Sequence, residues 1–251
     1  MKKEAVLKLA HDKQKIWTRD FILICLVNFF LFLGFQMTLP TIPLFVEHLG
    51  GNDQLIGLVV GIFTFSALII RPIAGHVIET KGRRFIFLIG LLLFLLSIGS
   101  YALVTGLLFL FVMRIFQGAG WGLSTTAAGT VVTDLLPVKR RGEGMGYFGL
   151  SGNIAMAFGP SLGLALIPIV NFQILFFICA ILVGIALLLS LFIHYKPVDK
   201  NTSSTKEKKW DLYEKTALKP SLLLFFITVT FGGIATFLPL YSLEVGVKGI
   251  T

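Results

Sequence analysis

Seven long apolar segments follow one another along the chain, separated by short polar stretches. Leu, Ile and Phe dominate these segments, and each is close to the ~20 residues that a helix needs to cross about 30 Å of hydrocarbon. Barrel strands would instead alternate over about ten residues. The pattern predicts an all-helical integral membrane protein with spans over 21–45, 55–75, 85–104, 107–133, 146–167, 173–194 and 219–241.

One longer polar stretch interrupts this pattern. Residues 196–218 are rich in Ser, Thr, Lys and Glu, the composition of a linker between helical bundles. We therefore expect three parts: a six-helix transmembrane bundle over 1–195, a central linker over 196–218, and a seventh helix with an outer stub over 219–251. Six helices followed by a linker are typical of one half of a two-bundle transporter.

Composition supports a membrane protein, since 55% of the residues are hydrophobic, 14% are charged and the mean hydropathy is +0.87. The net charge of +9 does not indicate a nucleic-acid partner, because the bases lie in alternate connections. They occupy the N-terminal segment and the loops 76–84, 134–145 and 195–218. The positive-inside rule places these in the cytoplasm and residue 251 outside a multi-pass cell-membrane protein. Orientation accounts for these basic loops, and a contact with anionic lipid is the alternative.

Residues typical of enzyme or metal sites are not grouped. Cys25 and Cys179 are expected in opposite leaflets, and the four His residues do not cluster at the spacing of metal ligands. No nucleophile-elbow, phosphate-loop or metalloprotease motif occurs. We therefore expect no enzyme activity, no metal and no cofactor.

A compact charged island separates the second and third spans. Its key residues are Gly75, Glu79, Gly82, Arg83 and Arg84. Gly82 is expected to break the chain so that the two arginines open the next helix. Asp134, at the inner end of the fourth span, is a candidate partner for Arg83. The island either gates the protein or only fixes its topology.

Arg114 is the exceptional residue of the fourth span. It lies about eight residues, or some 12 Å, inside the span, where a buried guanidinium costs about 2.5–3.5 kcal/mol. No Asp or Glu occurs inside any predicted span, so Asn28, Gln36 and Gln117 are the candidate polar partners. A functional role is the default for such a residue, and snorkelling or helix bracing is the alternative.

Small residues and prolines mark the fifth and first spans. Gly149, Gly152, Ala155, Gly159 and Gly163 recur at spacings of three and four, which predicts a stripe on which another helix packs closely. Pro160 removes one backbone hydrogen bond within this span. Pro40 and Pro43 mark either a bend beside a cavity or the end of the first helix. Phe35, Met37 and Trp121, with Asn28 and Gln36, are candidate walls of an apolar pocket.

Four of these segments together resemble the major facilitator superfamily. Residues Gly75 to Arg84 are similar to its loop pattern Gly-x-Leu-Ala-Asp-Arg-x-Gly-Arg-Lys, with Glu79 in place of Asp and Thr80 in place of the first Arg. "LGFQMTLPTIP", with Gly34, Pro40 and Pro43, resembles the first-helix signature of drug:proton antiporters. "RIFQGAG", with Arg114, Gln117 and Gly118, looks like the Arg-x-x-Gln-Gly-x-Gly motif. "GPSLG", with Gly159, Pro160 and Gly163, resembles the antiporter motif, although Ala155 and Leu164 replace its usual glycines.

The resemblance implies a proton-coupled exporter of small lipophilic or amphipathic compounds that works by alternating access. It implies that the charged island and Asp134 gate the protein, and that Arg114 tunes proton binding or balances charge in the cavity. Many antiporters carry a carboxylate in the first helix, which this chain lacks; Glu79, Asp20 or a second half are then the candidate proton carriers.

Two alternatives stay open, namely an exporter of a polar solute such as a metallophore or sugar, and a non-transporting membrane half. Seven helices further predict the front part of a twelve-helix protein, for which a C-terminal bundle or a second half is the expected partner.

Overall fold

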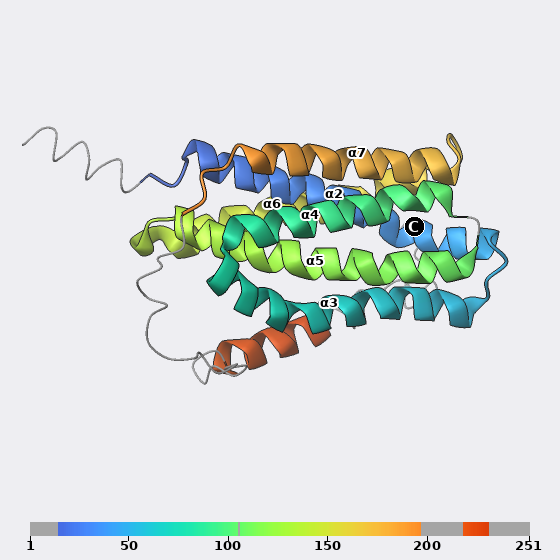
Figure 1. Ribbon diagram of the computed structural model, residues 1–251, viewed down its shortest axis with the longest axis horizontal. Helices are drawn as coiled ribbons and strands as arrows, with labels where there is room; N and C mark the ends of the chain where they lie inside the picture. Colours follow the sequence, from blue (N-terminus) through green and yellow to red (C-terminus); the bar gives the residue numbers. More distant parts are fainter. Residues whose placement is uncertain (1–14, 105, 197–217, 231–251) are drawn as a thin grey trace, which may run out of the picture. The chain divides into compact units, whose positions relative to one another are not determined.

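The computed structural model describes residues 15–104, 106–196 and 218–230, and the chain divides into two units, Met1–Ser204 and Thr205–Thr251. The described residues of the first unit form six α-helices and two short 3-10 turns, labelled as in Figure 1. They are α2 (Arg19–His48), α3 (Asp53–Lys81), α4 (Arg83–Ser100), η1 (Tyr101–Leu103), α5 (Leu107–Leu135), η2 (Val138–Arg140), α6 (Arg141–Leu166) and α7 (Phe172–Leu191). In the second unit, the described residues form one helix, Leu218–Thr230.

The predicted all-helical fold is confirmed, and the six expected spans of the first bundle match α2 to α7. The described helix of the second unit coincides with the start of the expected seventh span. The expected linker over 197–217 and the remainder of the seventh span lie outside the described residues. Five described helices, α2, α3, α4 with η1, α5 and α7, are long and apolar enough to cross a membrane. The Gly-rich α6 is long enough but less apolar.

Local sequence explains where the helices begin. The side chains of Thr18, Asn52 and Asn171 accept hydrogen bonds from backbone N–H groups in the first turns of α2, α3 and α7. Gly82 joins α3 to α4 with a φ of 92°, a conformation that favours glycine. The expected break before Arg83 is therefore confirmed.

The two prolines of the first span lie inside a helix. α2 continues past Pro40 and Pro43 to His48, so the reading that they end the helix is wrong. A membrane helix tolerates such prolines where neighbouring groups satisfy the freed carbonyls.

The six helices run side by side in one bundle (Figure 1). α5 packs against α3 and α4, while α2 packs against α6 and α7, and α4 also contacts α7. The charged island joins α3 to α4, the fourth-span motif lies on α5 and the fifth-span motif lies on α6. Packing between neighbouring helices therefore fixes the positions of all three.

Glycines permit the closest of these contacts. A Cβ added at Gly118 of α5 would lie 2.3 Å from the Phe63 carbonyl oxygen of α3, and one at Gly163 of α6 would lie 2.5 Å from the Met37 carbonyl oxygen of α2. Gly152, Ala155 and Gly159 are also buried in α6, as the small-residue stripe predicts. The fifth predicted member, Gly149, does not belong to this packed stripe. Gly149 is exposed, and no described atom outside its own helix comes within 4 Å of its added Cβ, because it faces away from α2.

Basic residues gather at one end of the bundle, where α2, α4 and α6 begin and α3, α5 and α7 end (Figure 1). We call this the basic end. Its described Lys and Arg residues are Lys15, Arg19, Lys81, Arg83, Arg84, Lys139, Arg140, Arg141 and Lys196. The described turns at the opposite end contain neither Lys nor Arg.

Candidate functional site

The centre of the candidate site is the guanidinium of Arg114, which is 1% exposed on α5. Its Nε donates a hydrogen bond of 3.1 Å to the Val59 carbonyl oxygen, and its Nη1 donates one of 2.7 Å to Gln117 Oε1. The guanidinium carbon lies 4.8 Å from the ring centroid of Phe63, within the range of a cation–π contact. α3 supplies both Val59 and Phe63. The close contact between α3 and α5 at Gly118 therefore positions the carbonyl oxygen and the ring that contact the guanidinium.

A second donor shares the same glutamine. Tyr101, at the start of η1, donates a 2.5 Å hydrogen bond from its hydroxyl to Gln117 Oε1. Gln117 is fully buried, and its Nε2 has no hydrogen-bond partner among the described residues. Such an amide costs about 1–3 kcal/mol when left unpaired.

The described partners of Arg114 are therefore all neutral groups. Among the described residues, its guanidinium contacts a backbone carbonyl, an amide oxygen and an aromatic face, with the Tyr101 phenol close by, and it pairs with no carboxylate. A buried cation held by dipoles alone remains an electrostatic attractor for an anion or for an ionisable acid.

Of the three polar partners considered from the sequence, the structure brings Gln117 to Arg114 and directs the other two toward α6. Asn28 Nδ2 donates to Ser151 Oγ at 2.9 Å and to the Phe148 carbonyl oxygen at 3.2 Å. Gln36 packs against Gly159, whose added Cβ would lie 2.5 Å from Gln36 Cβ. Asn28 therefore joins α2 to α6 by hydrogen bonds, and Gln36 packs α2 closely against α6.

Sequence reasoning missed Val59, Phe63 and Tyr101. Val59 acts through its backbone, which no residue type reveals. The one available signal is the position of Tyr101 at the end of an apolar span, where a buried phenol needs a hydrogen-bond partner.

An aromatic cluster continues from the Arg114 site into the bundle. Phe63 stacks on Phe35 with centroids 5.0 Å apart, and Phe35 lies 4.3 Å from Trp121. Phe32 and Phe94 flank Trp121 at 4.8 and 5.6 Å. We call these five residues the aromatic cluster. Phe35, Met37 and Trp121, expected to line an apolar pocket, are buried in this arrangement.

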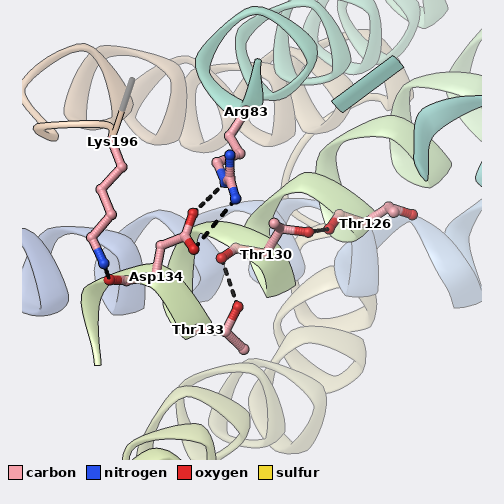
Figure 2. Close-up of polar contacts among 6 residues, drawn as sticks. All are labelled: Arg83, Thr126, Thr130, Thr133, Asp134 and Lys196. Atoms are coloured by element: carbon pink, nitrogen blue, oxygen red, sulfur yellow. Dashed lines mark hydrogen bonds and ion pairs between the residues drawn. The ribbon is translucent and has the colours of Figure 1, made fainter. Parts of the chain in front are cut away.

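The second part of the site lies at the basic end, where Asp134 connects three segments (Figure 2). Its carboxylate forms an ion pair with Arg83 at the start of α4. Its backbone carbonyl accepts a hydrogen bond from the Lys196 ammonium, just beyond α7. The side chains of Arg83 and Asp134 are 27% and 20% exposed. The structure thus places together the two residues that the sequence suggested as partners, while their gating role stays a prediction.

Threonines follow the same face of α5 toward Asp134 (Figure 2). Thr130 donates to the Thr126 carbonyl oxygen at 3.2 Å, and Thr133 donates to the Thr130 carbonyl oxygen at 2.8 Å. These hydroxyls are satisfied within their own helix, so they add polarity near the ion pair without fixing a neighbouring helix.

The other residues of the charged island take separate positions. Arg84 lies over the ring of Tyr195, with its guanidinium carbon 5.9 Å from the centroid. Glu79 is exposed in the last turns of α3, and Gly75 has no described atom outside its helix within 4 Å of an added Cβ.

A second arginine–carboxylate pair lies at the start of α6, outside the charged island. Arg140 donates two hydrogen bonds of 2.9 and 2.8 Å to the Glu143 carboxylate.

Comparisons with known proteins agree with this architecture. The chain is 26% identical over 216 residues to the Quinolone resistance protein NorA of Staphylococcus aureus (strain Mu50 / ATCC 700699), which covers 86% of this chain and 55% of that protein. It is 26% identical over 228 residues to Multidrug resistance protein 1 of Bacillus subtilis (strain 168), covering 90% of this chain and 58% of that protein. The chain therefore spans about half the length of the curated relatives it matches.

Solved structures share the fold at lower identity. A crystal structure of a POT family transporter in complex with 5-aminolevulinic acid matches with a TM-score of 0.68 and 17% identity, over 89% of this chain and 48% of that chain. A crystal structure of the nucleoside transporter NupG matches with a TM-score of 0.62 and 16% identity, over 83% of this chain and 53% of that chain. The family model of the Major Facilitator Superfamily matches residues 24–251. This match, over most of the sequence and the helices described above, shows that the chain is a multi-pass membrane protein that belongs to the Major Facilitator Superfamily.

Proposed function

We propose that this chain is the N-terminal part of a proton-driven exporter that moves small lipophilic or amphipathic compounds out of the cell by alternating access. The relatives named for quinolone and multidrug resistance support an exported substrate of this kind. No enzyme activity is proposed, since the similar proteins and the shared fold are those of transporters.

The observation that carries the proposal is the buried Arg114 cation with neutral partners. A carboxylic acid that comes near an uncompensated guanidinium has its pKa lowered and releases its proton. When the two groups separate, the acid takes a proton again. Alternation between these arrangements couples proton movement to the change of state, with Arg114 as the fixed cation.

The acid in this scheme comes from outside the first bundle. The described apolar helices carry no Asp or Glu at the depth of Arg114, and the substrate site of such transporters lies near the bilayer midplane between two halves. We therefore propose that a second six-helix half completes the transporter and supplies the proton-carrying residue.

The aromatic cluster supports the substrate class. Phe63 belongs both to the Arg114 site and to the stacked rings of Phe35 and Trp121. Aromatic faces attract lipophilic cations and give large apolar contact areas. Because these rings are buried here, we expect substrate to reach them in another state of the cycle.

The basic end supports a gate. The Arg83–Asp134 ion pair joins α4 to α5, and Lys196 joins the segment after α7 to the same aspartate. Making or releasing these charge-assisted contacts biases which of two conformations is populated. We assign this end to the cytoplasm from the excess of Lys and Arg there.

The test is transport in inverted membrane vesicles that contain this chain with its second half. A lipophilic fluorescent cation is added, and an imposed pH gradient should drive its accumulation in the vesicles until a protonophore removes the gradient. The Arg114→Ala protein, matched for membrane content, serves as the control and should show no accumulation.

Transport of a metallophore or sugar without any dye transport would favour the polar-solute exporter. No transport of any compound in a panel, with the protein inserted normally, would contradict an exporter.

A further inference from the structure

A pocket of about 520 Å³ opens at the basic end, away from the Arg114 site. It is lined by Arg19, Arg84, Leu191, Phe192, Ile193, His194 and Tyr195. These residues come from the start of α2, the start of α4 and the end of α7, which meet at this end of the bundle (Figure 1). The pocket belongs to neither the proposed proton pathway nor the aromatic cluster.

Two of the lining cations have no counter-ion in the described part of the chain. Arg84 contacts the Tyr195 ring, and Arg19 forms no ion pair with a described carboxylate. Two other arginines of the basic end differ, since Arg83 pairs with Asp134 and Arg140 with Glu143. The pocket therefore concentrates positive charge that no carboxylate among the described residues pairs with.

The remaining titratable groups at the pocket do not cancel this charge. Asp20 Oδ1 lies 3.3 Å from His194 Nδ1, so its one negative charge is shared with a group that is positive when protonated. Burial raises the pKa of Tyr195, and its hydroxyl donates to the Ser190 carbonyl oxygen at 2.7 Å. The phenol is therefore neutral beside Arg84, and the local balance stays positive.

The apolar wall of the pocket decides which anion fits. Leu191 and Phe192 line it and are largely exposed, and Leu188 is exposed one turn earlier on α7. At the same end, Trp17 is exposed beside Phe21 and Tyr147, in the manner of aromatic residues at a membrane interface. A free phosphate would use only the cations, whereas a phospholipid would use the cations and the adjoining apolar surface together.

We propose that this pocket binds the phosphate headgroup of an anionic phospholipid from the adjacent leaflet, with Arg19 and Arg84 on the phosphate and the acyl chains along the exposed end of α7. Basic pockets between transmembrane helices on the cytoplasmic side are suited to such headgroups. The lipid would hold the ends of α2, α4 and α7 together. This inference does not depend on transport.

The experiment measures binding of a fluorescent phosphatidylglycerol to the purified 251-residue chain in detergent. Arg19→Gln and Arg84→Gln should each weaken binding about 5-fold, and the double variant about 25-fold, from the attraction of one cation near an anionic surface. Arg84→Lys, which keeps the charge, should retain most of the binding. Lys139→Gln is the matched control, because Lys139 is an exposed cation of the same end that does not line the pocket.

Competition with unlabelled compounds distinguishes a phospholipid headgroup from free phosphate as the bound group. Unlabelled phosphatidylglycerol should displace the probe, while phosphatidylcholine and inorganic phosphate at equal concentration should not. Equal binding by the double variant and by Lys139→Gln would overturn the proposal. Displacement by inorganic phosphate as effective as by phosphatidylglycerol would overturn the assignment to lipid, as would equal displacement by phosphatidylcholine. Arg19 is exposed and forms no hydrogen bond, ion pair or ring contact with another described residue, so the single Arg19→Gln variant tests binding even if changes at Arg84 disturb folding.

Discussion

Arg114 and Arg83 lie on neighbouring helices, α5 and α4, yet the partners of their guanidinium groups differ in charge. Arg83 lies at the basic end, is 27% exposed on its side chain, and pairs with the carboxylate of Asp134. Arg114 is 1% exposed and is held by a carbonyl, an amide and an aromatic ring. Arg83 therefore has a counter-ion at a partly exposed position, and Arg114 has only neutral partners at a buried one.

This difference separates two uses of charge. An ion pair with access to water is worth little, about 0–1 kcal/mol, and can be broken and remade, as a gate requires. A buried cation without a counter-ion is costly, and a membrane protein retains such a residue at a functional site by default.

Replacement of Arg114 should have the largest effect on transport. In the full transporter, Arg114→Met should reduce proton-driven dye transport to background, because the fixed cation is lost. Stability should fall by no more than about 3.5 kcal/mol, since two charge-assisted hydrogen bonds of about 1.5–3 kcal/mol each are lost while the insertion cost of about 2.5–3.5 kcal/mol is relieved. Vesicle transport and thermal unfolding in detergent measure the two quantities.

Arg114→Lys is the companion variant. It keeps the charge but loses the planar donors that reach Val59 and Gln117 together, so little transport should return. Full transport by either variant would return Arg114 to a packing role.

The second prediction tests whether helix spacing maintains the Arg114 site. Gly118→Ala should destabilise the chain by about 1–3 kcal/mol, because the new Cβ would lie 2.3 Å from the Phe63 backbone oxygen and α3 would have to move. Gly129→Ala on the same helix is the control, since no described atom beyond the helix itself lies within 4 Å of its added Cβ. It should be neutral or stabilising by up to about 1 kcal/mol. Equal unfolding temperatures for the two variants would show that the contact at Gly118 is not limiting.

The third prediction concerns the ion pair. Asp134→Asn should lower the unfolding free energy by about 1 kcal/mol or less, because both partners are partly exposed. Transport should nevertheless fall several-fold if the pair sets the balance between two states. About 1 M salt should remove the stability difference between wild type and Asp134→Asn and leave the effects of Arg114 variants unchanged.

A charge exchange provides the control for this pair. Arg83→Asp combined with Asp134→Arg should restore more transport than either single variant. If both single variants transport normally with normal insertion, the pair does not gate.

The sequence predicted the fold well because membrane spans depend on length and hydropathy, which are local properties. It also indicated the contact between Arg83 and Asp134, since both lie at span ends of the same predicted side. It could not assign the partners of Arg114. Val59 contributes only its backbone, and Tyr101 reaches Gln117 only because the chain turns at η1 before α5 returns.

Asn28 and Gln36 show a second limit of the sequence. Their polarity inside an apolar helix made them candidates for the Arg114 site and for a cavity wall, and the structure places each against α6. A polar residue in a membrane helix indicates that some partner exists, and only the helix packing decides which one. Gly149 teaches the same lesson, because spacing alone placed it on a stripe that the rotation of α6 directs away from α2.

The smallest effect is expected at the second arginine–carboxylate pair of the basic end. Arg140 and Glu143 have better hydrogen-bond geometry than Arg83 and Asp134, with distances of 2.9 and 2.8 Å, and this bond raises the pKa of Arg140. However, their side chains are 43% and 45% exposed and lie three residues apart. The pair therefore stabilises a single helical turn and joins no two helices, and water and salt screen it. Glu143→Gln should leave both the unfolding temperature and transport unchanged within error, measured beside Asp134→Asn. If the two variants reduce transport equally, the basic end acts through its total charge, and the contact between α4 and α5 has no special part in the gate.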